Sequence, residues 1–390
     1  MANLAQTQDE FSKVNSLISF KNEESGLLYF TIENTNVSFV NAVRRTILSD
    51  IPTLVFHCFP DDKNDATFNA NTTRLNNEVL KQRLQCIPIH INDISLPYQE
   101  LVVEIDVKND TENTMDVTTE HFRVKNEKTG KYLTDTIIKK MFPSCPITKE
   151  YILFARLRPK VSTIIPGEEL SINAKMSLHT ASEDGSFNVA SICSYRCSPD
   201  KMAQDSAWQQ ELANISEEEK TNATALEMLK KNWYNHAGLR YHKEGSFDFK
   251  LESVGVFSNN ELIIKACDII TESIETLANK AIAGESLSVE KSISTIKNAV
   301  DIKLENIDYT IGKIIECVLH DNYYQGNVSK ILSYVGFRKN HPHDAHSIIR
   351  LGFIDTEIEA SAAEKAREII HECCNHAKQV INNIKQDFLG

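Results

Sequence analysis

Histidine and cysteine side chains are the groups in this sequence that come closest to forming a metal site. Residues 371–376 read His-Glu-Cys-Cys-Asn-His. The zinc-binding helix of a metalloprotease needs two histidines four positions apart, but the residue four positions after His371 is Asn375. We therefore expect an ordinary helix face at this segment rather than a metal site.

A second pair of possible ligands is Cys193 and Cys197. Zinc takes about four ligands at close spacing, and no further candidate lies nearby in the sequence, so we expect structural thiols. The sequence predicts no metal and no cofactor. A metal-dependent enzyme that uses the C-terminal histidines and cysteines remains an alternative, which elemental analysis would test.

Motifs for nucleotide chemistry are also missing from the sequence. It contains no Gly-x-x-x-x-Gly-Lys phosphate loop and no glycine-rich dinucleotide turn. The acidic run at 61–65 is too irregular for an aspartate-rich metal loop. No nucleophile stands beside a plausible base, so we predict no catalytic residue in this chain.

Two adjacent arginines are better suited to binding another protein. Arg44 and Arg45 lie beside an apolar stripe of helical spacing, which comprises Val40, Val43, Ile47 and Leu48. Such a helix could pack on one partner through the stripe and pair with acidic groups of another through its arginines. A solvated basic edge is the plainer explanation, and these residues alone favour it.

Hydrophobic periodicity predicts the elements that would position these residues. Strand regions are expected at 16–35, 99–160, 247–257, 292–306, 331–338 and 346–354. Helices are expected at 37–49, 76–84, 260–283, 309–321 and 358–387. Residues 60–76 are expected to form a loop, and 198–246 a polar inserted arm. Ser216 and Glu219 fit a capping box for one helix in that arm, ending near Lys231.

The predicted elements form two similar series, separated by a break at 284–286. After that break the order of strands, helix, strands and long helix returns in smaller form. This repetition predicts an α+β fold built from two related units.

Composition limits the class of protein. The 390 residues carry a net charge of −12, which opposes a general role in gripping nucleic acid. We expect no signal peptide and no membrane span, because the sequence lacks a basic start with an apolar stretch and any run of about 18 apolar residues. The 9 cysteines, an odd number, favour reduced thiols in the cytosol.

Residues 41–52 resemble the signature helix of alpha-type RNA polymerase subunits, which reads roughly Asn-(Ala/Ser)-Leu-Arg-Arg-x-Leu-x-(Ser/Ala)-(Asp/Glu)-Ile-Pro. Residues 78–89 resemble the second signature of the larger alpha-like subunit, the third-subunit type of eukaryotic and archaeal polymerases. Residues 249–255 resemble the strand end before that subunit's long helix. Its zinc-binding cysteine cluster has no counterpart here, because residues 90–150 contain only Cys145.

The C-terminal part resembles the smaller, eleventh-subunit-type alpha-like subunit. Residues 304–312 are similar to its Glu-x-x-Asp-His-Thr-(Leu/Ile)-Gly-Asn turn, although Tyr309 stands at the histidine position. Residues 334–342 are similar to its Gly-Tyr-x-x-x-His-Pro element. By this resemblance a turn, and not a metal site, is expected at the histidine cluster of His341, His343 and His346.

The resemblance implies that both alpha-like subunits are fused in one chain. Their two dimerisation domains would form an internal pseudo-heterodimer rather than a homo-oligomer, with a mostly β domain inserted. The expected larger domain comprises 15–58 and 150–284 with the arm at 198–246, the inserted domain 59–149, and the smaller domain 285–390.

A scaffolding role follows from the same resemblance, since alpha-like dimers nucleate polymerase assembly. The expected partners are the two largest polymerase subunits and small polymerase subunits, with nucleic acid touched only through the complex. Contacts with the large subunits are expected at Asn41, Arg44, Arg45, Glu78 and Arg83. The internal dimer contact is expected at Val43, Ile47, Ile311, Ile315 and the apolar face of 363–387.

Fusion of the two halves resembles polymerases of large cytoplasmic DNA viruses. It implies a location in host cytoplasm or in virions, with the nucleus as the fallback. A stand-alone adaptor that kept the alpha fold but left the polymerase is the alternative function. Such an adaptor would be soluble alone and would bind neither large subunit.

Overall fold

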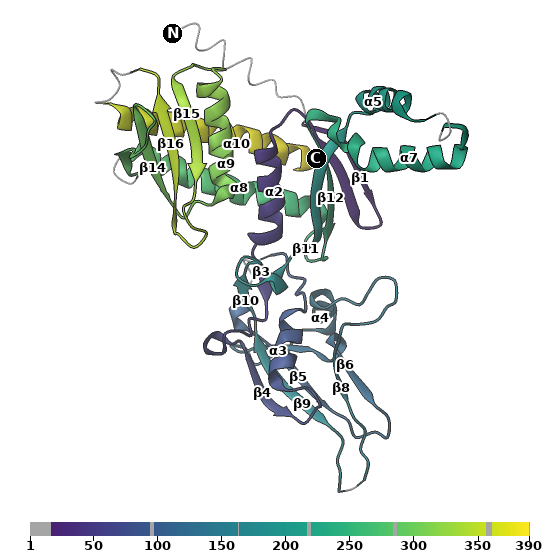
Figure 1. The fold of residues 1–390 in the computed structure, drawn as a ribbon. Coiled ribbons are helices and arrows are strands. Elements are labelled where there is room, and N and C mark those ends of the chain that lie inside the picture. The colour runs from purple at the N-terminus through teal and green to yellow at the C-terminus, as the bar shows by residue number, and fades with distance from the viewer. Residues whose placement is uncertain are drawn as a thin grey trace. The chain divides into compact units, whose positions relative to one another are not determined.

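The computed structural model describes residues 17–93, 97–162, 164–216, 220–283, 287–355 and 361–389. The chain divides into two compact units. Unit 1 comprises Met1–Thr46, Ile192–Glu252 and Ile263–Gly390, and unit 2 comprises Ile47–Ser191 and Ser253–Leu262. Both contain helices and small sheets (Figure 1), so the α+β prediction is confirmed. The predicted domain bounds stay a prediction.

Unit 1 is built on two four-stranded sheets. The N-sheet has the order β1 (Ile18–Glu24), β2 (Leu27–Ile32), β12 (His242–Ser253) and β11 (Ala190–Pro199). The C-sheet has the order β13 (Val289–Lys291), β14 (Ala299–Glu305), β16 (His346–Phe353) and β15 (Leu332–Arg338). Alternate residues of β2, namely Leu28, Phe30 and Ile32, are fully buried, as expected for a strand with one face in a core.

Long helices accompany these sheets. They are α2 (Val37–Ser49), α8 (Asn259–Ile282), α9 (Tyr309–Leu319) and α10 (Ala362–Leu389). Apolar residues three and four apart give α10 a buried stripe that includes Ile370, Ala377, Ile381 and Ile384. These four helices were predicted within a few residues of their observed bounds. The predicted start of the last helix at 358 and the break at 284–286 lie outside the described residues.

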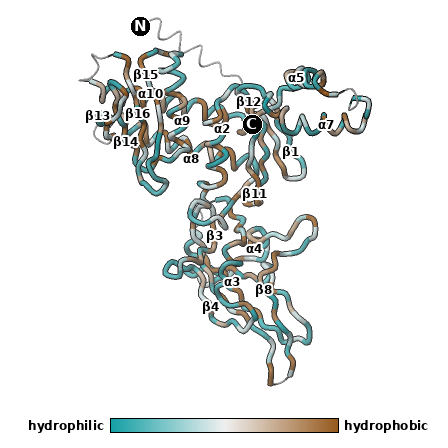
Figure 2. The backbone as a smooth tube through the Cα atoms, viewed as in Figure 1, coloured by the Kyte–Doolittle hydropathy of each residue, from teal (hydrophilic) through white to brown (hydrophobic). Residues whose placement is uncertain are grey.

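The arm in unit 1 holds two helices, α5 (Lys201–Asn214) and α7 (Ala223–Asn235). Asp200 and Asn222 cap them by accepting hydrogen bonds from backbone N–H groups. Figure 2 shows hydrophilic and hydrophobic residues interspersed along both helices. They meet through the Trp208 and Trp233 rings, whose centroids lie 5.6 Å apart.

The arm was predicted to hold one helix, from 216 to about 231, and α7 overlaps that range. Residues 201–214, for which the sequence predicted no helix, form α5, and α7 begins only after Asn222. The pattern was missed because only Gln204 and Trp208 are buried in α5. Of the predicted capping box, Glu219 lies outside the described residues.

Unit 2 contains one larger sheet and two strand pairs. The four-stranded sheet has the order β4 (Ala66–Asn71), β9 (Glu169–Lys175), β5 (Leu101–Lys108) and β7 (Arg123–Asn126). The pairs are β3 (Thr53–Val55) with β10 (Ser177–His179), and β6 (Met115–Thr118) with β8 (Leu153–Leu157). Helices α3 (Asn77–Gln85) and α4 (Asp135–Met141) complete this unit's core, which includes Phe56, Phe122, Phe142 and Phe154.

Further expectations differ from the structure in detail. Residues 60–76 are not all loop, because β4 lies inside them and pairs with β9. The strand expected at 247–257 begins earlier and ends earlier, as β12. The mostly β region at 99–160 holds the helix α4 besides its strands, and within 292–306 the strand β14 covers Ala299–Glu305.

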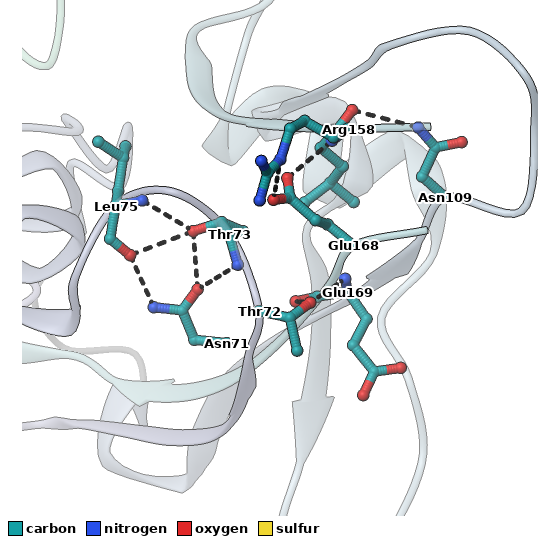
Figure 3. Close-up of polar contacts among 9 residues, drawn as sticks. Asn71, Thr72, Thr73, Leu75, Asn109, Arg158, Glu168 and Glu169 are labelled. Carbon is teal, nitrogen blue, oxygen red and sulfur yellow. Dashed lines mark hydrogen bonds and ion pairs between the residues drawn. The ribbon is translucent and has the colours of Figure 1, made fainter. Parts of the chain in front are cut away.

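Two similar turns end the strands that flank β9, and Figure 3 shows the first of them, at Asn71, Thr73 and Leu75. After β4, the Asn71 side chain accepts from the Thr73 N–H and donates to the Leu75 carbonyl. After β5, Asn109 accepts from the Thr111 N–H and donates to the Asn113 carbonyl. The Asn-x-Thr sequence at these places therefore serves local turn geometry.

Candidate protein interface

Arg45 joins α2 to the start of α9. Its Nε donates to the Thr310 hydroxyl at 3.0 Å, and its guanidinium pairs with Asp308 at 3.0 Å. Lys339 adds a longer contact of 3.9 Å to the same Asp308 carboxylate. Arg45 was predicted as a large-subunit contact. In the structure it forms an ion pair within the chain, although 40% of its side chain stays exposed.

Arg44 and Asn41 lie together on the same helix. The Arg44 Nε donates to the Asn41 Oδ1 at 3.0 Å, which fixes the guanidinium against α2. The neighbouring thiol of Cys193 is buried, and this burial raises its pKa to about 12 despite the opposing effect of Arg44. Both polar side chains are half-buried and keep part of their surface in solvent.

Glu78 and Arg83 lie on α3 in unit 2, and both are exposed. Asn76 caps this helix by accepting from the Val79 N–H at 2.9 Å. Arg83 donates to the Leu153 carbonyl at 2.8 Å. The five predicted contact residues therefore occupy two helices, with three residues on α2 and two on α3.

Helices α8 and α10 run antiparallel, side by side, in unit 1. Lys378 pairs with Glu275, and Lys385 pairs with Asp268 at 2.5 Å. Moving seven residues, or two turns, forward along α10 corresponds to moving seven residues back along α8. We call these two pairs the charge ladder. Sequence analysis missed it, although the i, i+7 spacing of opposite charges in the two helices was a usable signal.

The C-terminal end of α10 reaches the N-sheet. The Phe388 ring meets the Phe30 ring of β2 edge-on, with centroids 5.1 Å apart. Lys21 of β1 lies 4.5 Å above the centre of the Phe388 ring. Asp387 accepts from the Leu17 N–H at 2.9 Å. Elements from both ends of the chain therefore share one core.

The apolar residues expected at the internal contact are buried, as are those on the expected face of α10. Val43 and Ile315 are fully enclosed, and Ile311 is nearly so. Helix α9 packs against α10 and against β15, where the Phe337 ring covers Gly312. Ile47 is also buried but falls in the segment assigned to unit 2.

The cysteines and histidines considered as metal ligands have the following surroundings where the structure describes them. Cys193 and Cys197 lie four residues apart on β11, a separation of roughly 13 Å along an extended strand. Burial raises the pKa of the Cys374 thiol to about 12, and His371 bonds to Asn375 at 3.0 Å. The described residues contain no group of three or more metal-ligating side chains.

None of the helices in the described segments combines the length and the apolar character that a membrane span requires. The charged side chains of the charge ladder illustrate why even the long α8 and α10 do not meet that condition.

Comparison with known proteins gives a consistent result. Residues 29–274, more than half of the chain, match the RNA polymerase Rpb3/Rpb11 dimerisation domain. The DNA-directed RNA polymerase subunit Rpo3 of Methanosphaera stadtmanae is 24% identical over 67% of this chain and 97% of its own length. Rpo3 of Aeropyrum pernix is 24% identical over 74% of this chain and its full length.

A eukaryotic relative shows the same similarity. The DNA-directed RNA polymerases I and III subunit RPAC1 of Saccharomyces cerevisiae is 23% identical over 64% of this chain and 83% of its own length. The domain match spans α2, the arm and most of α8. The chain therefore belongs to the family defined by the RNA polymerase Rpb3/Rpb11 dimerisation domain.

Proposed function

We propose that this protein is a non-catalytic assembly subunit of a multisubunit DNA-directed RNA polymerase. The names of its relatives, all polymerase subunits, support this function. One structural observation supports it most directly. The α10 helix, which lies beyond the matched domain, packs along α8 and reaches the N-sheet within the same compact unit.

The C-terminal part, in this proposal, takes the place of a separate dimerisation partner. It has its own sheet and helices, and it meets the matched domain through the charge ladder, Arg45 and the Phe30–Phe388 contact. Apolar helix faces of this size would be unstable in water if left uncovered. A covalent link makes their encounter intramolecular, with an effective concentration in the millimolar range for a short flexible linker.

The surfaces proposed to receive the large subunits are on α2 and α3. Asn41 and Arg44 present a polar flank on α2, and Glu78 and Arg83 are exposed on α3. Arg45 has two roles in this proposal, because 40% of its side chain stays exposed beside the ion pair with Asp308. Arginine suits such a position since its planar group donates in several directions at once.

Affinity capture of the tagged chain from its native source tests the function. We expect two very large polypeptides and small subunits to co-purify with it. The Arg44→Ala variant should recover less of the large polypeptides at equal chain recovery. Arg240→Ala, at an exposed arm position, should behave like the wild type. Recovery of a lone chain under gentle salt would instead favour a stand-alone adaptor.

The proposed location is wherever that polymerase transcribes. We propose a viral enzyme in host cytoplasm or virions, on the fusion argument alone. The presence of the chain in purified virions, measured by mass spectrometry, would support this origin. Its confinement to nuclei of uninfected cells would contradict it.

A further inference from the structure

A groove in unit 1 has no role in the interface described above. Its volume of about 640 Å³ lies within the range of roughly 300–1,000 Å³ that is typical of binding pockets, so it can take several side chains at once. The start of α2, the start of β12, the end of α9 and the middle of α10 form it. Its described lining comprises Asn34, Thr35, Asn36, Val37, Phe39, Cys197, His242, Glu244, Gly245, Phe247, Cys317, Val318, Asp321, His376 and Val380.

Two carboxylates give this groove an acidic character. Glu244 and Asp321 line it, and no lysine or arginine is among its described lining residues. Glu244 is exposed and takes part in no ion pair between described residues. Asp321 contacts the neighbouring His320 ring at 3.1 Å, and 45% of its own side chain stays exposed. The apolar part of the lining comprises Val37, Phe39, Phe247, Val318 and Val380. By charge complementarity, the groove suits a segment that combines apolar side chains with a cation.

The described part of the chain begins beside this groove. The Leu17 carbonyl accepts a hydrogen bond from the Glu33 N–H at 2.8 Å, and the Leu17 N–H donates to Asp387 of α10 at 2.9 Å. Glu33 directly precedes Asn34, which lines the groove. Along α10, Val380 of the lining lies seven residues before Asp387, which is two turns or about 10 Å. The point at which earlier residues join Leu17 is therefore two helical turns from the groove.

The sequence before Leu17 has the chemistry that the groove suits. Residues 11–14 read Phe-Ser-Lys-Val, so a cation is accompanied by two apolar side chains. Lys13 stands four residues before Leu17, and four residues of extended chain span up to roughly 13 Å. This reach exceeds the length of two turns of α10, so Lys13 can enter the groove without any change in the described fold.

We propose that residues 11–14 of this same chain dock in the groove, with the Lys13 ammonium against the Glu244 or Asp321 carboxylate and the Phe11 ring against the apolar lining. Attachment to Leu17 gives the segment a high effective concentration at the groove, so weak contacts are enough to hold it there. The docked segment adds a contact between the start of the chain and the helices α9 and α10 near its end.

Zero-length cross-linking of the full-length protein tests the assignment. A carbodiimide joins an ammonium to a carboxylate only where the two groups are in contact. We expect peptide mass spectrometry of the monomer to find Lys13 joined to Glu244 or to Asp321. Lys21 is the matched control, because its ammonium lies 4.5 Å above the centre of the Phe388 ring, and it should be joined to neither carboxylate.

Charge variants test the same contact through amide hydrogen exchange of residues 11–16. Lys13→Glu should exchange several-fold faster than the wild type, because its carboxylate meets those of the groove. Adding Glu244→Lys and Asp321→Lys should slow the exchange again, since opposite charges then face each other. Lys13→Arg is the matched control: it keeps the positive charge and the slow exchange, but it has no amine that a carbodiimide can join.

Several outcomes would overturn the assignment. Lys13 could be joined to neither carboxylate, or residues 11–16 could exchange as fast in the wild type as in Lys13→Glu. A link found only between two chains would assign the groove to a second copy. Equal binding of a separate acetylated Phe-Ser-Lys-Val peptide to the wild type and to Lys13→Glu would show a groove that is open to a partner polypeptide. The assignment involves no large-subunit contact, so its failure would leave the proposed polymerase function untouched.

Discussion

The cysteines of this protein differ in their surroundings, and the surroundings of each thiol set its pKa and therefore its reactivity as a nucleophile. Cys58 and Cys267 are buried and Cys317 is half-buried, and burial raises the pKa of each thiol to about 12. Cys145 is exposed, and hydrogen bonds from the backbone and side chain of Thr148 lower its pKa. Because the thiolate is the nucleophile, the lowered pKa favours reaction at Cys145 near neutral pH.

We predict that iodoacetamide alkylates Cys145 several-fold faster than Cys86 at neutral pH. Cys86 is the matched comparison, because it is also exposed but its pKa is raised by burial and by Asp184. The measurement is a time course of peptide mass spectrometry on the native protein. Raising the pH toward the pKa of Cys86 should narrow the difference between the two alkylation rates. Equal rates at neutral pH would contradict the hydrogen-bonded turn around Cys145.

Helix α9 illustrates how packing overrides local preference at the scale of an element. Alanine is the better helix former, by about 1 kcal/mol over glycine. At Gly312, however, an added Cβ would lie 2.1 Å from the Phe337 ring of β15. Phe337 is itself nearly buried and has little room to move.

Gly312→Ala should therefore destabilise the protein, by about 1–3 kcal/mol, because overpacking outweighs the gain in helix propensity. Thermal or urea unfolding measures the change. The double variant with Phe337→Leu should recover part of the loss, since it removes the ring that clashes. Higher stability of Gly312→Ala alone would show that α9 and β15 are less closely packed.

The elements that sequence analysis found are those with long, regular apolar patterns. Helices α2, α8 and α10 each repeat buried residues over several turns, so their existence could be predicted from spacing. Strand β4 was missed because it is an edge strand whose residues alternate mostly among Asn, Thr and Ala. Helix α5 was missed because its caps and the Trp208 contact, rather than a stripe, hold it.

The candidate interface was predictable only in part. Arg44 and Arg45 stood out as a pair, but their type could not reveal that Arg45 meets Asp308, which lies far away in the sequence. The charge ladder joins residues more than a hundred positions apart. Such pairings depend on how two helices align, and hydrophobic periodicity sets which face is buried but not the axial register.

At the scale of the whole molecule, the charge ladder tests how the C-terminal part is attached. Exposed ion pairs each contribute only about 0.2–1 kcal/mol to the free energy of unfolding, so removing one pair should lower that energy only a little. Reversing one charge of a pair places like charges together and should lower the free energy of unfolding further. We predict that Lys385→Glu lowers the unfolding temperature, and that adding Asp268→Lys restores most of it.

The matched control is Lys365→Glu, on the same helix but within a pair to Glu368 of α10 itself. Its effect should not be relieved by Asp268→Lys. A Lys385→Glu variant that is unaffected by the compensating change would mean that α8 and α10 do not keep this register in solution.

The most direct test of the account is templated RNA synthesis in material captured through this chain. The account predicts that template-dependent incorporation of ribonucleotides stays with the tagged chain after washing. It also predicts that removing the chain from an extract removes the activity in proportion. RNA synthesis that remains wholly in the unbound fraction, while the folded chain is recovered alone, would contradict the account.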